Sequence, residues 1–240
     1  AAGAHAAERL AADGQLPRDA VARRHAAHCI HLARNAALDT TGPAHHREVD
    51  GPSPIDDVRA ALAWALGGGD ALLGAHLTLQ AAPLFAARRL QREHAQCLER
   101  ALSQLSEGAT QDRLRLQLLI DWGQACLAEG ECRQAMSAWR GGAELAHRLG
   151  DATAELAALQ GMCEVHGMNA EPAVATATAR RHEALARATA DATALRVADR
   201  LLAWGLHLAG RHAEAMAHVT RALVPCPPTL RQARGGPRLA

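Results

Sequence analysis

The sequence predicts an all-α protein, a right-handed α-solenoid of antiparallel helical hairpins, and three observations predict it. Helical periodicity of apolar residues runs through most of the 240-residue chain. Alanine and leucine dominate the apolar residues, whereas aromatic residues make up only 2% of the chain. Such a composition suits closely packed helices and not strands, which favour β-branched and aromatic residues. A pattern of helix starts also recurs about every 40 residues, which is typical of stacked hairpins.

The first part of the chain, residues 15–67, is expected to be a helical connector. A helix is predicted from Pro17 to about Ala37, because proline is well tolerated in a first helical turn. Residues 39–54 are rich in glycine, proline and histidine and predict a loop.

A second connector helix is predicted after this loop. Ser53 is placed as its N-cap, and Pro54 in the first turn needs no hydrogen-bond partner for its nitrogen. The helix is expected to end at Gly67-Gly68-Gly69. Its buried face is predicted from an apolar stripe at helical spacing: Ile55, Val58, Ala61, Leu62 and Ala65.

Residues 68–226 are expected to form helical repeats, in which each unit is two helices separated by a short break. An aspartate recurs near a helix start at Asp70, Asp112, Asp151 and Asp191, with spacings of 42, 39 and 40 residues. The expected repeats are therefore about 70–111, 112–150, 151–190 and 191–226. Residues 227–240 are expected to be an irregular tail.

The breaks inside the units differ in sequence. The second unit breaks at Glu129-Gly130-Glu131 and the fourth at Ala209-Gly210-Arg211, whereas the third has Ala170-Glu171-Pro172 and the first has no turn glycine. A Trp-Gly pair, Trp122-Gly123 and Trp204-Gly205, is interpreted as holding the same place in its two units.

The second unit resembles the tetratricopeptide repeat, because small, turn and large apolar residues follow one another in that family's order. The matching residues are Trp122-Gly123, Gly130, Ala135, Trp139 and Gly142, and in the fourth unit Gly210, Ala215, Val219, Ala222-Leu223 and Pro227. The resemblance implies stacked hairpins whose first helices line a binding groove.

A second resemblance covers the upstream half of the chain. Its residues are Val21-Ala22-Arg23-Arg24-His25-Ala26, then Ile55 to Ala65, then Gly69-Asp70, Leu73-Gly74 and Leu98-Glu99-Arg100-Ala101-Leu102. In this order they resemble the C-terminal region of bacterial winged-helix transcriptional regulators that carry a STAND-class signalling ATPase. By this resemblance residues 1–14 would be the end of a preceding regulatory module or a linker helix.

The resemblance implies a signal-transduction protein with a DNA-binding winged helix and an ATPase upstream of this segment. A P-loop needs a lysine, and the chain contains none, so we expect no ATP chemistry here. We expect a non-catalytic sensor or protein-binding domain without a cofactor. Its partner would be another protein, its own upstream ATPase or DNA-binding modules, or a small effector.

Charge and cysteine usage narrow the function further. The formal net charge is +1 with both signs interspersed, which predicts no direct contact with nucleic acid or a membrane surface. The six cysteines follow no disulfide framework, so we expect a reduced, cytoplasmic chain. Cys126 and Cys132 flank one break and could approach each other, but two small core residues are the favoured interpretation.

An alternative function is an all-α metal-binding sensor or enzyme. His25, His28, Cys29 and His31 share one predicted helix, and His45-His46 in the following loop could complete a site. Metal sites need three or four converging ligands, whereas these pairs face different sides of the helix. We therefore favour surface histidines and expect no metal.

A candidate interaction surface follows from the tetratricopeptide resemblance, in which first helices line the groove. Its residues are Gln117, Gln124, Met162, His166, Arg200, Trp204 and His207. Core packing is the competing interpretation of Trp204, because burial is the commoner use of a large ring.

Overall fold

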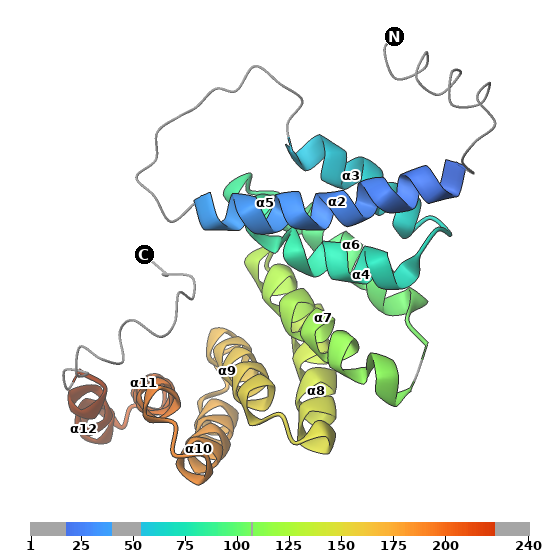
Figure 1. The fold of residues 1–240 in the computed structure, drawn as a ribbon. Helices are drawn as coiled ribbons and strands as arrows, with labels where there is room; N and C mark the ends of the chain where they lie inside the picture. The colour runs from blue at the N-terminus through green and yellow to red at the C-terminus, as the bar shows by residue number, and fades with distance from the viewer. Residues whose placement is uncertain (1–17, 40–53, 107, 224–240) are drawn as a thin grey trace. The chain divides into compact units, whose positions relative to one another are not determined.

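The computed structural model describes residues 18–39, 54–106 and 108–223, and every regular element within them is a helix (Figure 1). The chain divides into two compact units, Ala1–Glu155 and Leu156–Ala240. The helices are α2 (Arg18–Asp39), α3 (Pro54–Ala65), α4 (Ala71–Gln80), α5 (Ala82–Ala87), α6 (Gln91–Gln104), α7 (Ala109–Ala128), α8 (Cys132–Leu149), α9 (Ala152–Met168), α10 (Pro172–Ala188), α11 (Ala192–Leu208) and α12 (His212–Leu223).

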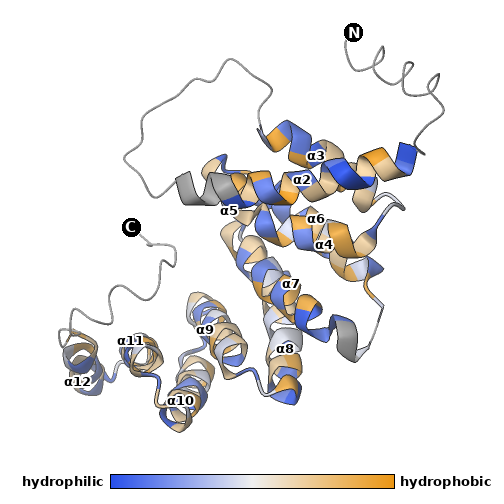
Figure 2. Ribbon diagram, in the orientation of Figure 1, coloured by the Kyte–Doolittle hydropathy of each residue, from blue (hydrophilic) through white to orange (hydrophobic). Residues whose placement is uncertain are grey.

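The predicted all-α class is confirmed for the described residues. The helices α2 and α3 follow the two predicted connector helices closely. The predicted N-cap Ser53, the inner part of the 39–54 loop, residues 1–14 and the 227–240 tail lie outside the described residues. Most helices carry both hydrophilic and hydrophobic residues (Figure 2), as expected where part of each helix packs against a neighbour.

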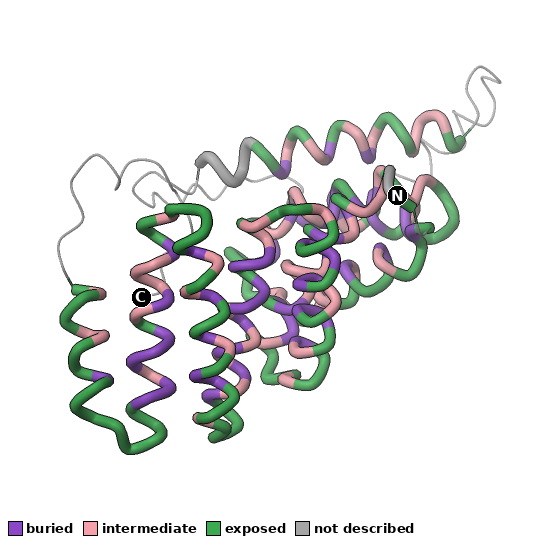
Figure 3. Tube along the Cα trace, turned by 90° about the horizontal axis from the view of Figure 1, so that it is seen from below, coloured by how far each residue is buried: buried purple, intermediate pink, exposed green. Residues whose placement is uncertain are grey.

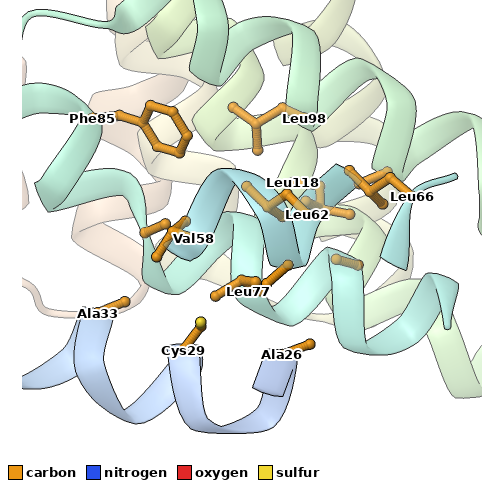
Figure 4. Packing of buried hydrophobic residues seen from close by; sticks show 14 of the residues in the cluster. Ala26, Cys29, Ala33, Val58, Leu62, Leu66, Leu77, Phe85, Leu98 and Leu118 are labelled. Carbon is orange, nitrogen blue, oxygen red and sulfur yellow. The ribbon is translucent and has the colours of Figure 1, made fainter. Parts of the chain in front are cut away.

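The core of the first unit forms where α2, α3, α4 and α6 meet. The predicted stripe of α3 is buried, since Ile55, Val58, Ala61, Leu62 and Ala65 are all nearly inaccessible to solvent. Figure 4 shows Cys29 of α2 pointing toward Leu77 of α4, and Phe85 and Leu98 belong to the same cluster of buried residues. Burying each of these larger side chains stabilises the fold by about 1.5–3 kcal/mol.

The first repeat departs from the expected pair of helices, because its first helix is interrupted. α4 ends at Gln80, and the short α5 begins at Ala82 with Pro83 in its first turn. Proline cannot donate a backbone hydrogen bond and its ring clashes with the carbonyl one turn earlier, which explains the interruption. The prediction of two helices for this repeat was wrong.

The helix-start aspartates act as expected. The carboxylates of Asp70, Asp151 and Asp191 accept hydrogen bonds from backbone N–H groups of the first turn of α4, α9 and α11. Asp112 lies inside the first turn of α7. The carboxylates of Asp70, Asp151 and Asp191 thus satisfy N–H groups that have no partner within the helix, and all four aspartates lie near the positive end of a helix dipole.

Left-handed residues fix the register of the hairpins. Gly130, Ala170 and Gly210 have φ values of 79°, 56° and 74° in the turns that join α7 to α8, α9 to α10 and α11 to α12. These positions are 40 residues apart, as are Gly150 and Ala190, with φ values of 67° and 52°. The three breaks that the sequence predicted are therefore confirmed, and the period of these hairpins is 40 residues.

This register corrects the interpretation of the Trp-Gly pairs. Trp122 precedes the left-handed Gly130 by eight residues, whereas Trp204 precedes Gly210 by only six. The two pairs therefore do not hold the same place. Gln124, and not Trp122, holds in α7 the place that Trp204 holds in α11.

Glycines within the helices allow neighbouring helices to come close. A Cβ at Gly123 would clash with the Trp139 ring of α8, and one at Gly205 would lie 2.8 Å from Oγ1 of Thr176 on α10. These glycines are therefore contact positions between helices, where the missing side chain makes room for a neighbour.

Candidate interaction surface

The first helices of the second unit, α9 and α11, present one row of residues each. With the 40-residue register, Gln160 and Glu164 of α9 correspond to Arg200 and Trp204 of α11. The four residues are half-buried or exposed. They therefore lie on an accessible side of α9 and α11, and we name this set the first-helix face.

Polar contacts connect the two rows. Nε2 of Gln160 donates a hydrogen bond of 3.0 Å to Oε1 of Glu164, and the same carboxylate oxygen lies 3.7 Å from Nη2 of Arg200. The Arg200 side chain is 54% exposed, so this ion pair is screened by solvent and contributes little stability. The guanidinium remains accessible, with donors left for a carboxylate of a partner.

Trp204 lies beside Arg200 and has both a packing role and an exposed part. Its ring covers Gly167 of α9, where any Cβ would clash with the ring. The residue nevertheless stays half-exposed. Packing between repeats and contact with a partner are thus both compatible with this side chain, as tryptophan has a large area and little rotamer freedom.

His207 is exposed on the last turn of α11 and lies against His212 at the start of α12. The two ring centroids are 5.0 Å apart with a tilt of 52°. Beside them lies a shallow, mainly apolar hollow at the junction of α11 and α12. The hollow is lined by Ala203, Trp204, His207, His212, Ala215, Met216 and Val219.

Met162 and His166 do not share the places of Arg200 and Trp204. Both are half-buried on α9, two residues further along than the register requires. Nδ1 of His166 lies 2.6 Å from Oε2 of Glu171, so the imidazole holds the turn around Ala170. Sequence reasoning missed Gln160 and Glu164, which spacing from Ala170 would have found.

Gln117 and Gln124 are both exposed on α7 of the first unit. Gln124 corresponds in register to Glu164 and Trp204, whereas Gln117 corresponds to Ala157 and Val197. They extend the list of exposed first-helix residues, although they belong to the first unit and the first-helix face to the second.

The histidine cluster of α2 is only partly brought together. Nε2 of His25 lies 3.7 Å from Sγ of Cys29 and 4.0 Å from Oδ1 of Asp57, whereas His28 and His31 are exposed. Within the described ranges, no group of three or more His, Cys, Asp or Glu side chains could hold a metal ion. His45 and His46 lie outside those ranges.

The buried cysteines are not activated for chemistry. Cys126 and Cys132 are free thiols, as are the other described cysteines. Burial raises the pKa of Cys126 and of Cys163 to about 11, so both thiols are protonated at neutral pH. A protonated, buried thiol is a poor nucleophile and behaves as a small apolar residue.

Comparison with solved structures identifies the fold. A structure of kinesin light chain nearly identical TPR-like repeats from Podosopora anserina superposes with a TM-score of 0.63 at 12% identity, covering 87% of this chain and 95% of that chain. A second structure of these repeats superposes with a TM-score of 0.61 at 12% identity and covers 86% of this chain and 95% of that chain. The chain has a tetratricopeptide-like fold. At this identity the likeness concerns the fold of the tetratricopeptide-like repeats alone.

Sequence comparisons add no closer relative. No family model matches the chain, and no curated protein sequence matches it significantly. Among the helices of the described residues, none combines the length and the apolar composition needed to cross a bilayer.

Proposed function

We propose that this chain is a non-catalytic protein-interaction domain that binds a partner along the first-helix face. The proposal is carried by one observation, the side-by-side display of Arg200 and Trp204 on α11 next to Gln160 and Glu164 on α9. Arginine and tryptophan are the residue types most enriched among energetically dominant interface residues. Helical-repeat proteins use such extended helix faces for binding.

The partner that this face fits is a protein segment with acidic and apolar residues. Arg200 offers a planar set of donors that matches a carboxylate, and Trp204 offers a partly exposed apolar ring. We further propose the context implied by the upstream resemblance. The domain would act in the cytoplasm of a bacterium and regulate the ATPase and winged-helix modules of a transcriptional regulator.

Site-specific photocrosslinking in the source cell tests this proposal. A photoreactive p-benzoylphenylalanine replaces Arg200 in one variant and the exposed Ala177 of the second helix α10 in a control. We expect a discrete protein adduct from position 200 that is absent from position 177. Mass spectrometry of the adduct then identifies the partner, and an ATPase or winged-helix polypeptide would support the finer proposal.

Identical adducts from both positions would show that the first-helix face has no selectivity and would contradict the proposal. A selective adduct with an unrelated protein would keep the interaction function and reject the regulator context. Circular dichroism of both variants serves as the folding control, because position 200 and position 177 are both exposed.

A further inference from the structure

The hollow between α11 and α12 lies on the last described hairpin of the second unit. Its walls are apolar residues of α11 and α12 together with the rings of His207 and His212. Met216, in one wall, is 63% exposed. Figure 3 shows α12 mostly in the exposed colour, whereas the neighbouring α11 contains many buried residues.

In the preceding hairpin, α9 and α10, the equivalent surface is covered by the helix α11. α11 packs on α9 and α10, where Gly167 lies beneath the Trp204 ring and Thr176 lies against Gly205. In the same contact, three small residues of α9 and α10 cluster with Leu201 and Leu202 of α11. They are Cys163, Ala175 and Ala179.

The hollow is the same surface one period later. Adding the 40-residue period to Gly167, Thr176 and the three small residues just named gives five residues of α11 and α12. They are Ala203, His207, Ala215, Met216 and Val219, and all five line the hollow. The other two lining residues, Trp204 and His212, correspond in the same way to Glu164 and Pro172.

We infer that this hollow is a docking site for an amphipathic α-helix of a partner protein, seated as α11 is seated on α9 and α10. The interface is thus continuous with the packing inside the second unit. It goes beyond the proposed function, because Met216 and Val219 lie on α12 and not on the first-helix face.

The 40-residue register also predicts which residue types the partner helix carries. Two apolar residues, in the places of Leu201 and Leu202, would contact Ala203, Ala215 and Val219. A small residue would face Met216, as Gly205 faces Thr176. The Trp204 ring of α11 lies on Gly167, and the residue of the hollow that corresponds to Gly167 is His207. A histidine leaves no room for a large ring, so the partner helix is expected to carry a carboxylate in the place of Trp204.

A segment of another chain fits this site better than the residues one period after α11. That stretch contains two glycines and a proline in succession, which are the residues with the lowest helix propensity. They are Gly235, Gly236 and Pro237.

A peptide with the sequence of residues 191–209, in which Glu replaces Trp204, is a direct probe. Fluorescence anisotropy of the labelled peptide is measured against the full chain. We expect saturable binding that Met216→Arg weakens by at least about tenfold. Ala217→Arg, at an exposed α12 position outside the hollow, is the matched control and should bind as the unaltered chain does.

Equal binding by the Met216→Arg and Ala217→Arg chains, or by a scrambled peptide, would overturn the inference. Sedimentation velocity tests whether a second copy of this chain occupies the hollow. A dimer that Met216→Arg dissociates would overturn the assignment to a partner protein. A disulfide formed between Met216→Cys and Cys226 within one chain would likewise overturn it in favour of the chain's own residues. Arg200→Ala should leave peptide binding unchanged, which separates failure here from failure of the first-helix face.

Discussion

Ala170 and Ala190 adopt the left-handed backbone that glycine adopts at the matching positions of the neighbouring hairpins. Their φ values are 56° and 52°. For a residue with a Cβ this conformation costs on the order of 1 kcal/mol, because the Cβ approaches the following carbonyl. The surrounding helix ends hold both residues there, since the turn hydrogen bonds are the same as in the glycine turns.

Glycine at either position should therefore stabilise the chain. We expect Ala170→Gly and Ala190→Gly to raise the free energy of unfolding by up to about 1 kcal/mol, as the relief of strain exceeds the added entropy of the unfolded chain. Chemical denaturation provides the measurement. Ala177→Gly, within α10, is the control and should lower stability by about 0.5–1 kcal/mol; equal losses in all three variants would refute the strain argument.

Two buried histidines predict how stability depends on pH. Burial lowers the pKa of His94, whose Nε2 lies 3.1 Å from the Thr78 carbonyl oxygen, and of His182, whose Nδ1 is buried without a hydrogen-bond partner among the described residues. The unfolded chain then binds protons more readily than the folded chain. The stability from the neutral rings is present above the unfolded pKa of about 6.5 and is lost as pH falls through the lower folded values.

The measurement is urea denaturation at pH 7.5 and pH 5.5, with lower stability expected at pH 5.5. His182→Gln should reduce the difference in stability between the two pH values, because glutamine does not titrate.

Asp121 affects the pH dependence of stability in the opposite direction, since burial raises its pKa to about 6 and disfavours its charged form. Asp121→Asn should therefore stabilise the chain by about 1–2 kcal/mol at pH 7.5 and have little effect near pH 4. A pH-independent effect of either substitution would contradict these assignments.

At the scale of helices, the contact between α9 and α11 depends on Gly167. A methyl group there would clash with the Trp204 ring. We expect Gly167→Ala to lower the free energy of unfolding by about 1–3 kcal/mol through overpacking. Gly141 of α8 is the matched control, because a Cβ there would lie 3.9 Å from Leu119 Cδ1 and in ordinary contact.

Thermal denaturation distinguishes the two glycines. Gly141→Ala should be neutral or stabilising by about 0.5–1 kcal/mol, since alanine has the higher helix propensity. In a double-mutant cycle, Trp204→Ala should remove most of the cost of Gly167→Ala. Additive effects would mean that the ring and the glycine do not pack as described.

At the scale of the whole molecule, stability should differ between the last two helices. Seven residues of α11 are buried, among them Ala198, Leu201 and Leu206. In α12, by contrast, only Ala215 is buried among the residues that the structure describes. Repeat proteins unfold more readily where an element has fewer neighbours. We expect hydrogen exchange by mass spectrometry to show faster exchange in α12 than in α11, and equal protection of the two would contradict this expectation.

The sequence by itself determined the helical class, most helix ends and the breaks of the hairpins. Aspartate caps, glycine stops and apolar stripes act within one or two turns, so they can be recognised without knowing any neighbour. Gly130 and Gly210 mark turns because glycine alone adopts their backbone without strain. Arg200, Trp204 and His207 could be placed on one side of a helix for the same local reason.

Only the tertiary structure decided the register and which residues meet. Ala170 gives no local sign of a left-handed turn, because its conformation is imposed by the helices on both sides. Gly167 and Gly205 look like helix-weakening residues until the Trp204 ring and Thr176 are seen against them. Gln160 and Glu164 could have been found from their spacing to Ala170 once the period was known. The α12 side of the hollow could not, because contacts between helices depend on relative placement, which a pattern along one helix does not contain.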